Sequence, residues 1–210
     1  MKKSILSLLL LTSIASIVNA QSEKYVPAMQ KNLALFDSIK TAQDFLDLEG
    51  KFERIANAEK TQWLPYYYAG LCEALYGFRD SKADKDAVGG KVLELAGKAD
   101  TLQKSDETKV VAYMGYILQL MVDPQNRYMS YGPKANHELE EGLKMNVNNP
   151  RLYLMKGQGL LNTPEFVGGG KAVAKPVLEK AVALFETDKP QPLYPKWGKE
   201  QAIQALEKCK

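Results

Sequence analysis

Apolar residues recur along this 210-residue chain at the three- and four-residue spacing of amphipathic helices. No run alternates apolar and polar residues between hairpin turns, so strands are not expected. The pattern predicts an all-α fold. We expect helices over residues 22–39, from residue 41 onward, and over 63–78, 88–102, 105–122, 133–145, 150–161, 171–186 and 197–208.

Local signals support several of these helix starts. Thr41 followed three residues later by Asp44 resembles a capping box. Ser105 is suited to capping the helix that follows it. Asn149 suits an N-cap and Pro150 the first helical position, so one helix should end and another begin there.

A spacing of small residues and leucine recurs along the chain. A glycine lies in the middle of an apolar helix, and the next helix carries a small residue, a leucine four residues later and another small residue three after that, which share one helical face. The copies are Gly70 with Gly89-Leu93-Ala96, Gly115 with Ala135-Leu139-Gly142, and Gly157 with Ala174-Leu178-Ala181. Repeated helix pairs of this kind predict a solenoid, in which each pair covers its neighbour's apolar face.

This pattern resembles the tetratricopeptide repeat (TPR) family. The steps from Ile55 to Gly70 and from Gly142 to Gly157 are each fifteen residues, as in that family. The resemblance implies a right-handed superhelix of about four helix pairs with a closing C-terminal helix. The steps from first-helix glycine to second-helix small residue are 19, 20 and 17 residues, longer than the family's unit. We therefore expect enlarged turns at residues 80–88, 123–133 and 162–170.

The turn from Pro164 to Gly170 is similar to one in exported bacterial TPR-like proteins, where Pro-x-x-x-Gly-Gly precedes a helix. Some of those proteins are lipoproteins of solute-uptake systems. This resemblance adds small-solute binding to the functions that the chain could have.

The N-terminus predicts export. Lys2 and Lys3 precede an apolar run from Ile5 to Val18, and small residues flank the bond after Ala20. These features indicate a signal peptide over residues 1–20, leaving a TPR-like domain over 21–210 in the periplasm or outside the cell. The alternative is an uncleaved membrane anchor, for which the run is short. The residue directly after the cleavage site is Gln21 and not a cysteine, which disfavours a lipoprotein.

Charge and cysteine content narrow the partners. Removing Lys2 and Lys3 lowers the formal net charge from +3 to +1, which gives no electrostatic case for nucleic acid or an anionic membrane surface. No stable membrane insertion is expected after cleavage. Cys72 reads as a buried apolar residue, whereas Cys209 could pair with Cys72 or with a second chain in an oxidising compartment. The oligomeric state stays open.

Candidate chemistry is sparse. Gly168 to Gly170 could cradle a phosphate, but no strand precedes them, and the favoured interpretation is that the glycines let an enlarged turn pass close to its neighbour. His137 is the only histidine and shares a helical face with Glu141 alone, which makes a poor metal site. No second histidine completes a nucleophilic triad. We therefore expect neither an enzyme nor a cofactor.

Aromatic residues cluster between positions 63 and 76. They are Trp63, Tyr66, Tyr67, Tyr68 and Tyr76. Adjacent residues of a helix face different ways, so some of these rings must pack inside while others could stack on a ligand. The set is read mainly as packing.

A binding face follows from the resemblance, because first helices line the concave side of TPR proteins. Aligning on the three central glycines places seven residues there: Tyr67, Lys109, Tyr116, Gln119, Arg151, Gln158 and Asn162. The alternative is ordinary surface, with Arg151 holding a carboxylate at a helix start.

Three functions remain, in order of preference. The first is a non-catalytic interaction module that binds a protein or peptide in its concave groove. The second is a small-solute-binding accessory of an uptake system, and the third is an enzyme, which lacks any visible catalytic set.

Overall fold

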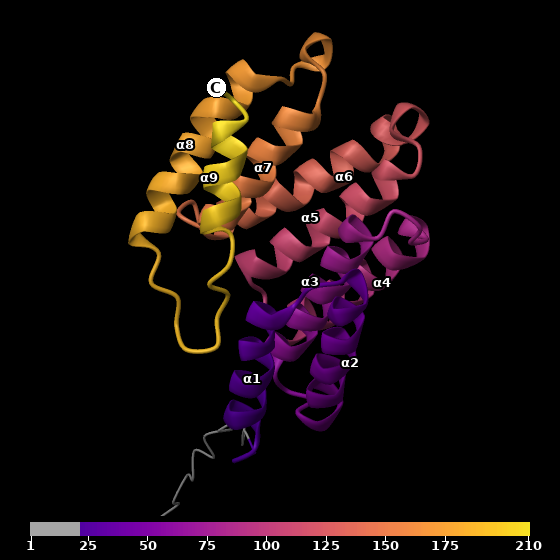
Figure 1. The fold of residues 1–210 in the computed structure, drawn as a ribbon, viewed down its shortest axis with the longest axis vertical. Coiled ribbons are helices and arrows are strands. Elements are labelled where there is room, and N and C mark those ends of the chain that lie inside the picture. The colour runs from indigo at the N-terminus through magenta and orange to yellow at the C-terminus, as the bar shows by residue number, and fades with distance from the viewer. Residues whose placement is uncertain (1–21) are drawn as a thin grey trace, which may run out of the picture.

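The computed structural model describes residues 22–210, and the predicted signal peptide lies outside the described residues. These residues form helices and no strands, which confirms the all-α prediction (Figure 1). The elements are α1 (Tyr25–Leu33), η1 (Ala34–Ser38), α2 (Ala42–Ala58), α3 (Trp63–Arg79), α4 (Lys85–Leu102), α5 (Asp106–Met121), α6 (Pro124–Met145), α7 (Pro150–Asn162), η2 (Glu165–Val167), α8 (Lys171–Thr187) and α9 (Lys199–Glu207).

Helices α2 to α6 stack in sequence, and α3 also lies against α5, which is the arrangement of a helical solenoid. The predicted small residues lie where helices approach most closely. A Cβ atom on Gly70 would lie 3.0 Å from a methyl carbon of Val111 in α5, and one on Gly115 would lie 3.1 Å from the backbone oxygen of Gly89 in α4. The small residues of the repeated spacing therefore lie at contacts between helices that leave little room for a larger side chain.

The predicted caps are present. The Thr41 hydroxyl accepts a hydrogen bond from the Asp44 N–H, and the Asp44 carboxylate accepts one from the Thr41 N–H. The Ser105 hydroxyl accepts from the N–H of Glu107, and the Asn149 side chain accepts from that of Arg151. These bonds satisfy helix-start donors that would otherwise lack partners.

The structure corrects two of the three expected enlarged turns: the one at 123–133 is absent, and the one at 80–88 is shorter, spanning residues 80–84. Residues 124–133 belong to α6, with Pro124 in its first turn and the Asp123 carboxylate accepting a hydrogen bond from the N–H of Asn126. An aspartate before proline thus ends one helix and caps the next. Helix α4 likewise begins at Lys85, capped by Asp84. The extra repeat length is mostly added helix.

The third turn, after α7, has the predicted glycine geometry. Gly168 and Gly170 adopt φ angles of +90° and +96°, which L side chains rarely adopt. A Cβ atom on Gly169 would collide with the backbone of Thr163. The three glycines therefore let this enlarged turn pass close to the end of α7, as the favoured interpretation held.

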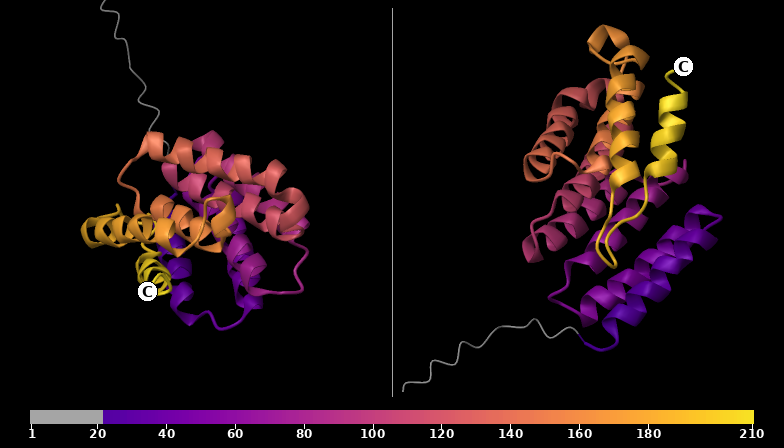
Figure 2. Two further views of the ribbon diagram at one scale, coloured as in Figure 1. Left: turned by 90° about the horizontal axis from the view of Figure 1, so that it is seen from above. Right: turned by 90° about the vertical axis from the view of Figure 1, so that its left-hand side faces the viewer.

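The stack becomes irregular after α6. Helix α7 packs mainly on α8, which packs on α9, while α6 and α7 share few contacts, among them Leu152 against Gly142. The connector, residues 188–198, then runs back toward the N-terminal helices (Figures 1 and 2). It reaches α3, where the Tyr68 hydroxyl donates a 2.7 Å hydrogen bond to the Leu193 carbonyl.

The aromatic cluster packs mainly inside, as predicted. Trp63, Tyr67 and Tyr68 are buried, and Tyr66 and Tyr76 are half-buried. Cys72 is buried, Cys209 is half-buried, and both thiols are free, so no disulfide joins them. Among residues 22–210, no helix has the length and apolar character needed to cross a membrane.

Candidate functional site

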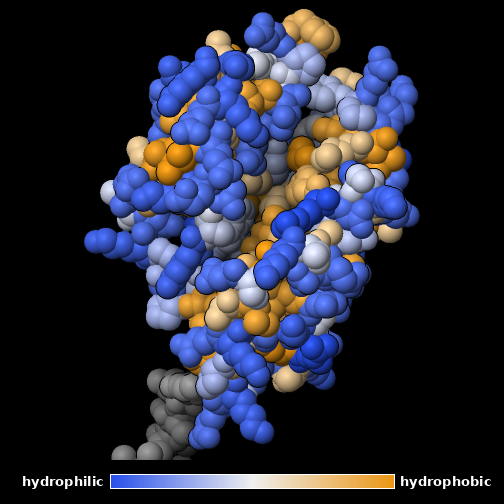
Figure 3. All heavy atoms as spheres, viewed as in Figure 1, coloured by the Kyte–Doolittle hydropathy of each residue, from blue (hydrophilic) through white to orange (hydrophobic). Residues whose placement is uncertain are grey.

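One face of the molecule is hollowed between two groups of helices (Figure 3). Helices α7–α9 form one wall and helices α3–α6 the other, and apolar side chains line much of the floor between them. The hollow lies where α6 and α7 share few contacts. Loss of the regular stacking at that junction therefore opens this face.

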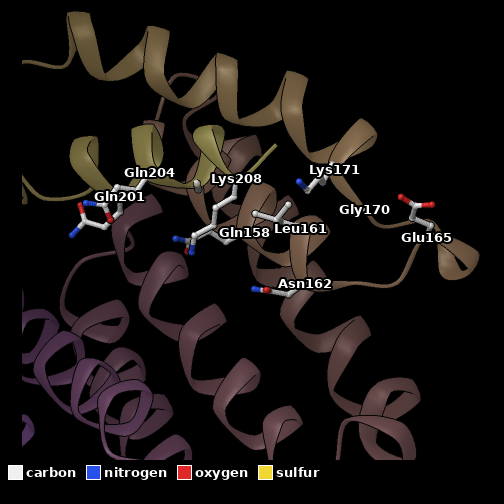
Figure 4. A pocket seen from close by; sticks show the side chains of 10 residues that line it. Gln158, Leu161, Asn162, Glu165, Gly170, Lys171, Gln201, Gln204 and Lys208 are labelled. Atoms are coloured by element: carbon white, nitrogen blue, oxygen red, sulfur yellow. The ribbon is translucent and has the colours of Figure 1, made fainter. Parts of the chain in front are cut away.

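A cavity of about 530 Å³ lies at the α7–α9 wall (Figure 4). This volume falls within the range of roughly 300–1,000 Å³ typical of small-molecule sites. Its lining comes from α7, the following turn, the start of α8, and α9. The residues are Gln158, Leu161, Asn162, Glu165, Gly170, Lys171, Gln201, Gln204, Ala205 and Lys208.

The lining combines amide, ammonium and apolar groups with one carboxylate, that of Glu165. Gln158 and Leu161 of α7 and Lys208 of α9 meet in the same space, whereas Glu165 lies apart, near Gly170 at the turn (Figure 4). Amides donate and accept hydrogen bonds, and the two lysines only donate. This set suits an amphipathic ligand that carries acceptor or anionic groups.

A buried polar network joins the inner ends of the helices that form the hollow. Arg151 in the first turn of α7 pairs with Glu107 in the first turn of α5, Nε to Oε1, at 2.8 Å. Its Nη1 lies 3.1 Å from Asp188 in the connector. Asn149 and Tyr67 also donate hydrogen bonds to Glu107. Burial raises the pKa of Glu107, an effect that Arg151 partly offsets.

This network corrects the predicted role of two residues. Tyr67 and Arg151 are 0% and 3% exposed, so neither is free to contact a partner. The connector covers them, since Trp197 donates a hydrogen bond to the Tyr67 hydroxyl and its carbonyl accepts one from Arg151. Arg151 holds a carboxylate at a helix start, which was the alternative interpretation.

Three further predicted residues face neighbouring helices. Lys109 lies 3.3 Å from Asp100 of α4 and 3.5 Å from Glu138 of α6. Gln119 lies against Gly89 of α4. Tyr116 is half-buried, and burial together with the Glu138 charge raises its pKa. Gln119, four positions after Gly115, shares the helical face that lies against α4. A binding role for these three residues stays a prediction.

The remaining two predicted residues, Gln158 and Asn162, line the cavity. Their role in binding stays a prediction. Sequence reasoning missed Lys171, Gln201, Gln204 and Lys208. Helix α9 was expected only to close the stack, and no local signal indicates that it faces α7 across a cavity.

Metal chemistry finds no support in the described residues. Among residues 22–210, no group of three histidine, cysteine or carboxylate side chains is placed to hold a metal ion. His137 is exposed on α6, as predicted, and does not line the cavity.

The fold matches that of a solved structure. The chain resembles the HusA haemophore from Porphyromonas gingivalis with a TM-score of 0.82 and 31% sequence identity, over 90% of this chain and 94% of that one. The chain belongs to the HusA family. No protein-family model and no curated protein sequence matches it. The helical-repeat architecture predicted from the TPR resemblance is therefore present in a HusA-family protein, without a match to the TPR family itself.

Proposed function

We propose that this HusA-family protein is an exported, non-catalytic binder of a small amphipathic molecule, with haem as the first candidate. The observation that carries the proposal is 31% identity to a haemophore along nearly the whole chain. This identity supports small-solute binding, the second of the predicted functions, over the peptide-binding scaffold. It also favours a location outside the cytoplasm.

The cavity chemistry supports this ligand class. Haem is a flat apolar ring with two carboxylates at one edge. Lys171 and Lys208 could pair with those carboxylates, and Leu161 and the apolar floor of the hollow could cover the ring. No histidine, cysteine or methionine lines the cavity, so recognition here would depend on the ring and its carboxylates.

Titration of the mature domain with haem and with metal-free protoporphyrin tests this proposal. We expect the two to bind with affinities within about threefold of each other, because no side chain of the cavity would ligate the iron. Lys171→Gln combined with Lys208→Gln should weaken both by roughly tenfold, equivalent to about 1.4 kcal/mol.

The matched control is Lys175→Gln, an exposed lysine of α8 outside the cavity lining. It should leave both affinities unchanged. Absence of saturable binding by either porphyrin would contradict the proposal. Equal effects of the lysine pair and the control would place the site elsewhere.

A protein partner is a second candidate because large apolar side chains are exposed in the turn after α7 and in the first half of α6. Phe166 in the turn after α7 is 90% exposed, and Met129 near the start of α6 is 81% exposed. Each has an exposed apolar neighbour in the chain, Val167 and Tyr128. Contiguous exposed apolar surface marks interaction sites in many soluble proteins. Loss of a cross-linked envelope partner on Phe166→Ser with Met129→Ser, but not on Val147→Ser, would support it.

A further inference from the structure

The wall that α9 gives to the α7–α9 cavity is one face of a short helix. Gln201, Gln204, Ala205 and Lys208 line the cavity, and offsets of three, four and seven residues place them on the same side of the helix. The two glutamines and the lysine are exposed, so their polar groups are free to meet a ligand. The direction in which this face points depends on how the helix is held.

Most of α9 is weakly attached to its neighbours. Its buried side chains are Ala202 and Ala205, small residues that bring little apolar area, beside the half-buried Leu206. Among residues 22–210, the ion pair that joins α9 to another helix is that of Lys199 with Glu186 of α8, whose side chains are 43% and 58% exposed. Exposed ion pairs add little stability. The position of α9 therefore depends strongly on how its first residues are anchored.

The start of α9 is held tightly. Gly198, the residue before the helix, has a φ angle of +114°, which favours glycine. A Cβ atom there would lie 2.5 Å from the Phe185 ring of α8 and 3.4 Å from the Arg151 side chain of α7. The first point of α9 is therefore seated between α7 and α8.

Trp197, directly before Gly198, ties this point to α3 as well. Its indole Nε1–H donates a 2.9 Å hydrogen bond to the Tyr67 hydroxyl, and its carbonyl accepts a 3.3 Å hydrogen bond from Arg151. The Tyr67 hydroxyl donates its own proton to Glu107, which leaves its lone pairs for the indole. A single residue thus joins the start of α9 to both α3 and α7.

A small change at this anchor is amplified along the helix. At about 1.5 Å of rise per residue, Lys208 lies roughly 15 Å beyond Gly198, so a tilt of about 10° at Gly198 moves it by about 2.6 Å. The heavy atoms of a hydrogen bond are about 3 Å apart, so a displacement of that size breaks one. The placement of Lys208 therefore depends on contacts made at the other end of α9.

We propose that Trp197 is a positioning residue for the α7–α9 cavity, which holds α9 in the orientation that turns Lys208 toward the residues of α7. Trp197 does not line the cavity and acts through α9. The ligand is that of the proposed function, on which this inference rests. Loss of the indole N–H weakens the porphyrin through Lys208 and leaves the contribution of Lys171, in α8, unchanged.

The first test needs no ligand. Trp197→Phe keeps an aromatic ring in the connector and removes the indole donor, and amide hydrogen exchange of the mature domain measures how firmly α9 is held. We expect residues 201–208 to exchange about fivefold faster, the effect of losing one hydrogen bond, with α8 unchanged. Unchanged exchange of α9 would overturn the proposal.

The matched control for that test is Tyr194→Phe. It removes another hydrogen bond of the connector, the one that the Tyr194 hydroxyl accepts from Gln103 at the end of α4. Exchange of α9 should equal that of the wild type. Equal acceleration by Tyr194→Phe and Trp197→Phe would assign the effect to the connector as a whole and overturn the role of Trp197.

The second test is a double-mutant cycle with protoporphyrin. In the wild type, Lys208→Gln should weaken binding about threefold, the share of one lysine in the roughly tenfold loss expected for the pair. In Trp197→Phe it should weaken binding less than about 1.5-fold, because the two residues act as a unit. Lys171→Gln should cost about threefold in both backgrounds. An equal loss from Lys208→Gln in both would overturn the proposal.

The positioning role and the proposed function fail separately. Absence of porphyrin binding by the wild type would contradict the proposed function, and exchange of α9 would still decide whether Trp197 holds that helix. Porphyrin binding without coupling between Trp197 and Lys208 would overturn the positioning role alone.

Discussion

The α4–α5 and α6–α7 junctions each join one helix pair to the next, but different interactions hold them. At the first, Gly89 and Gly115 bring two helix backbones together along their length. At the second, α7 shares few contacts with α6, and Arg151 fixes its first turn to α5 and the connector through carboxylates. Apolar packing holds the α4–α5 junction together, whereas ion pairs of Arg151 hold the α6–α7 junction.

This difference bears on the proposed ligand site. Close apolar packing leaves no space between helices, because a protein interior is as dense as an organic crystal. A junction held at one end by a buried ion pair can diverge at its other end, and the hollow of Figure 3 lies there. The polar network thus lets the fold remain ordered beside an open face.

The largest expected effect comes from breaking the charged junction. Arg151→Ala should lower the free energy of unfolding by about 3–5 kcal/mol, because it leaves Glu107 buried without its partner. Denaturant unfolding measures this change. Arg151→Met with Glu107→Met should recover much of the loss, since it removes both charges. A loss below about 1 kcal/mol for Arg151→Ala would mean that charge does not hold this junction.

A smaller effect is expected in the regular stack. Leu118 of α5 is 0% exposed and packs where Gly77 of α3 approaches it. Leu118→Ala should cost about 3 kcal/mol through lost burial and the cavity left behind. The comparison is sharpened by ligand binding: Arg151→Ala should also weaken porphyrin binding, whereas Leu118→Ala should not. The control Val147→Ala, at a 56% exposed position, should change stability by less than about 0.5 kcal/mol.

Interactions within one or two turns of a helix could be predicted from the sequence. The capping residues Thr41, Ser105 and Asn149 and the small residues of the helix faces need only their neighbours in the chain to be recognised. The same local reasoning misread residues 124–133, since a proline can begin a helix as readily as it ends one.

The candidate site was less predictable because it depends on contacts between distant segments. The alignment placed Arg151 on the concave face as a residue that contacts a partner, but a connector about 40 residues later in the chain covers it. Lys208 lines the cavity only because α9 folds back beside α7 and α8. The helical periodicity of the sequence does not indicate which helices the proline-rich connector packs against. The burial of Arg151 and the position of Lys208 therefore become visible only in the tertiary structure.

The smallest expected effect concerns Glu73, a buried carboxyl group among the apolar contacts of the regular stack. Glu73 of α3 is 5% exposed, and one of its carboxylate oxygens lacks a partner among the described residues, while nearby Lys91 pairs with Glu49. Burial raises the pKa of Glu73, and the Lys91 charge only partly opposes this. The folded state therefore binds this proton more tightly than the unfolded state, and the carboxyl destabilises the fold as pH rises above the ordinary value of 4.5.

Glu73→Gln should consequently raise the melting temperature at about pH 8 by on the order of 2 °C, and the gain should shrink as pH falls toward 4.5. Melting curves across this range measure it. Glu94→Gln is the matched control, because Glu94 is exposed, pairs with Lys98, and has a pKa lowered by that contact. It should give no gain at pH 8. If the rise in melting temperature for Glu73→Gln persisted unchanged at low pH, the amide would act by improving the packing. The charge of Glu73 would then not be the cause of the lower stability of the wild type.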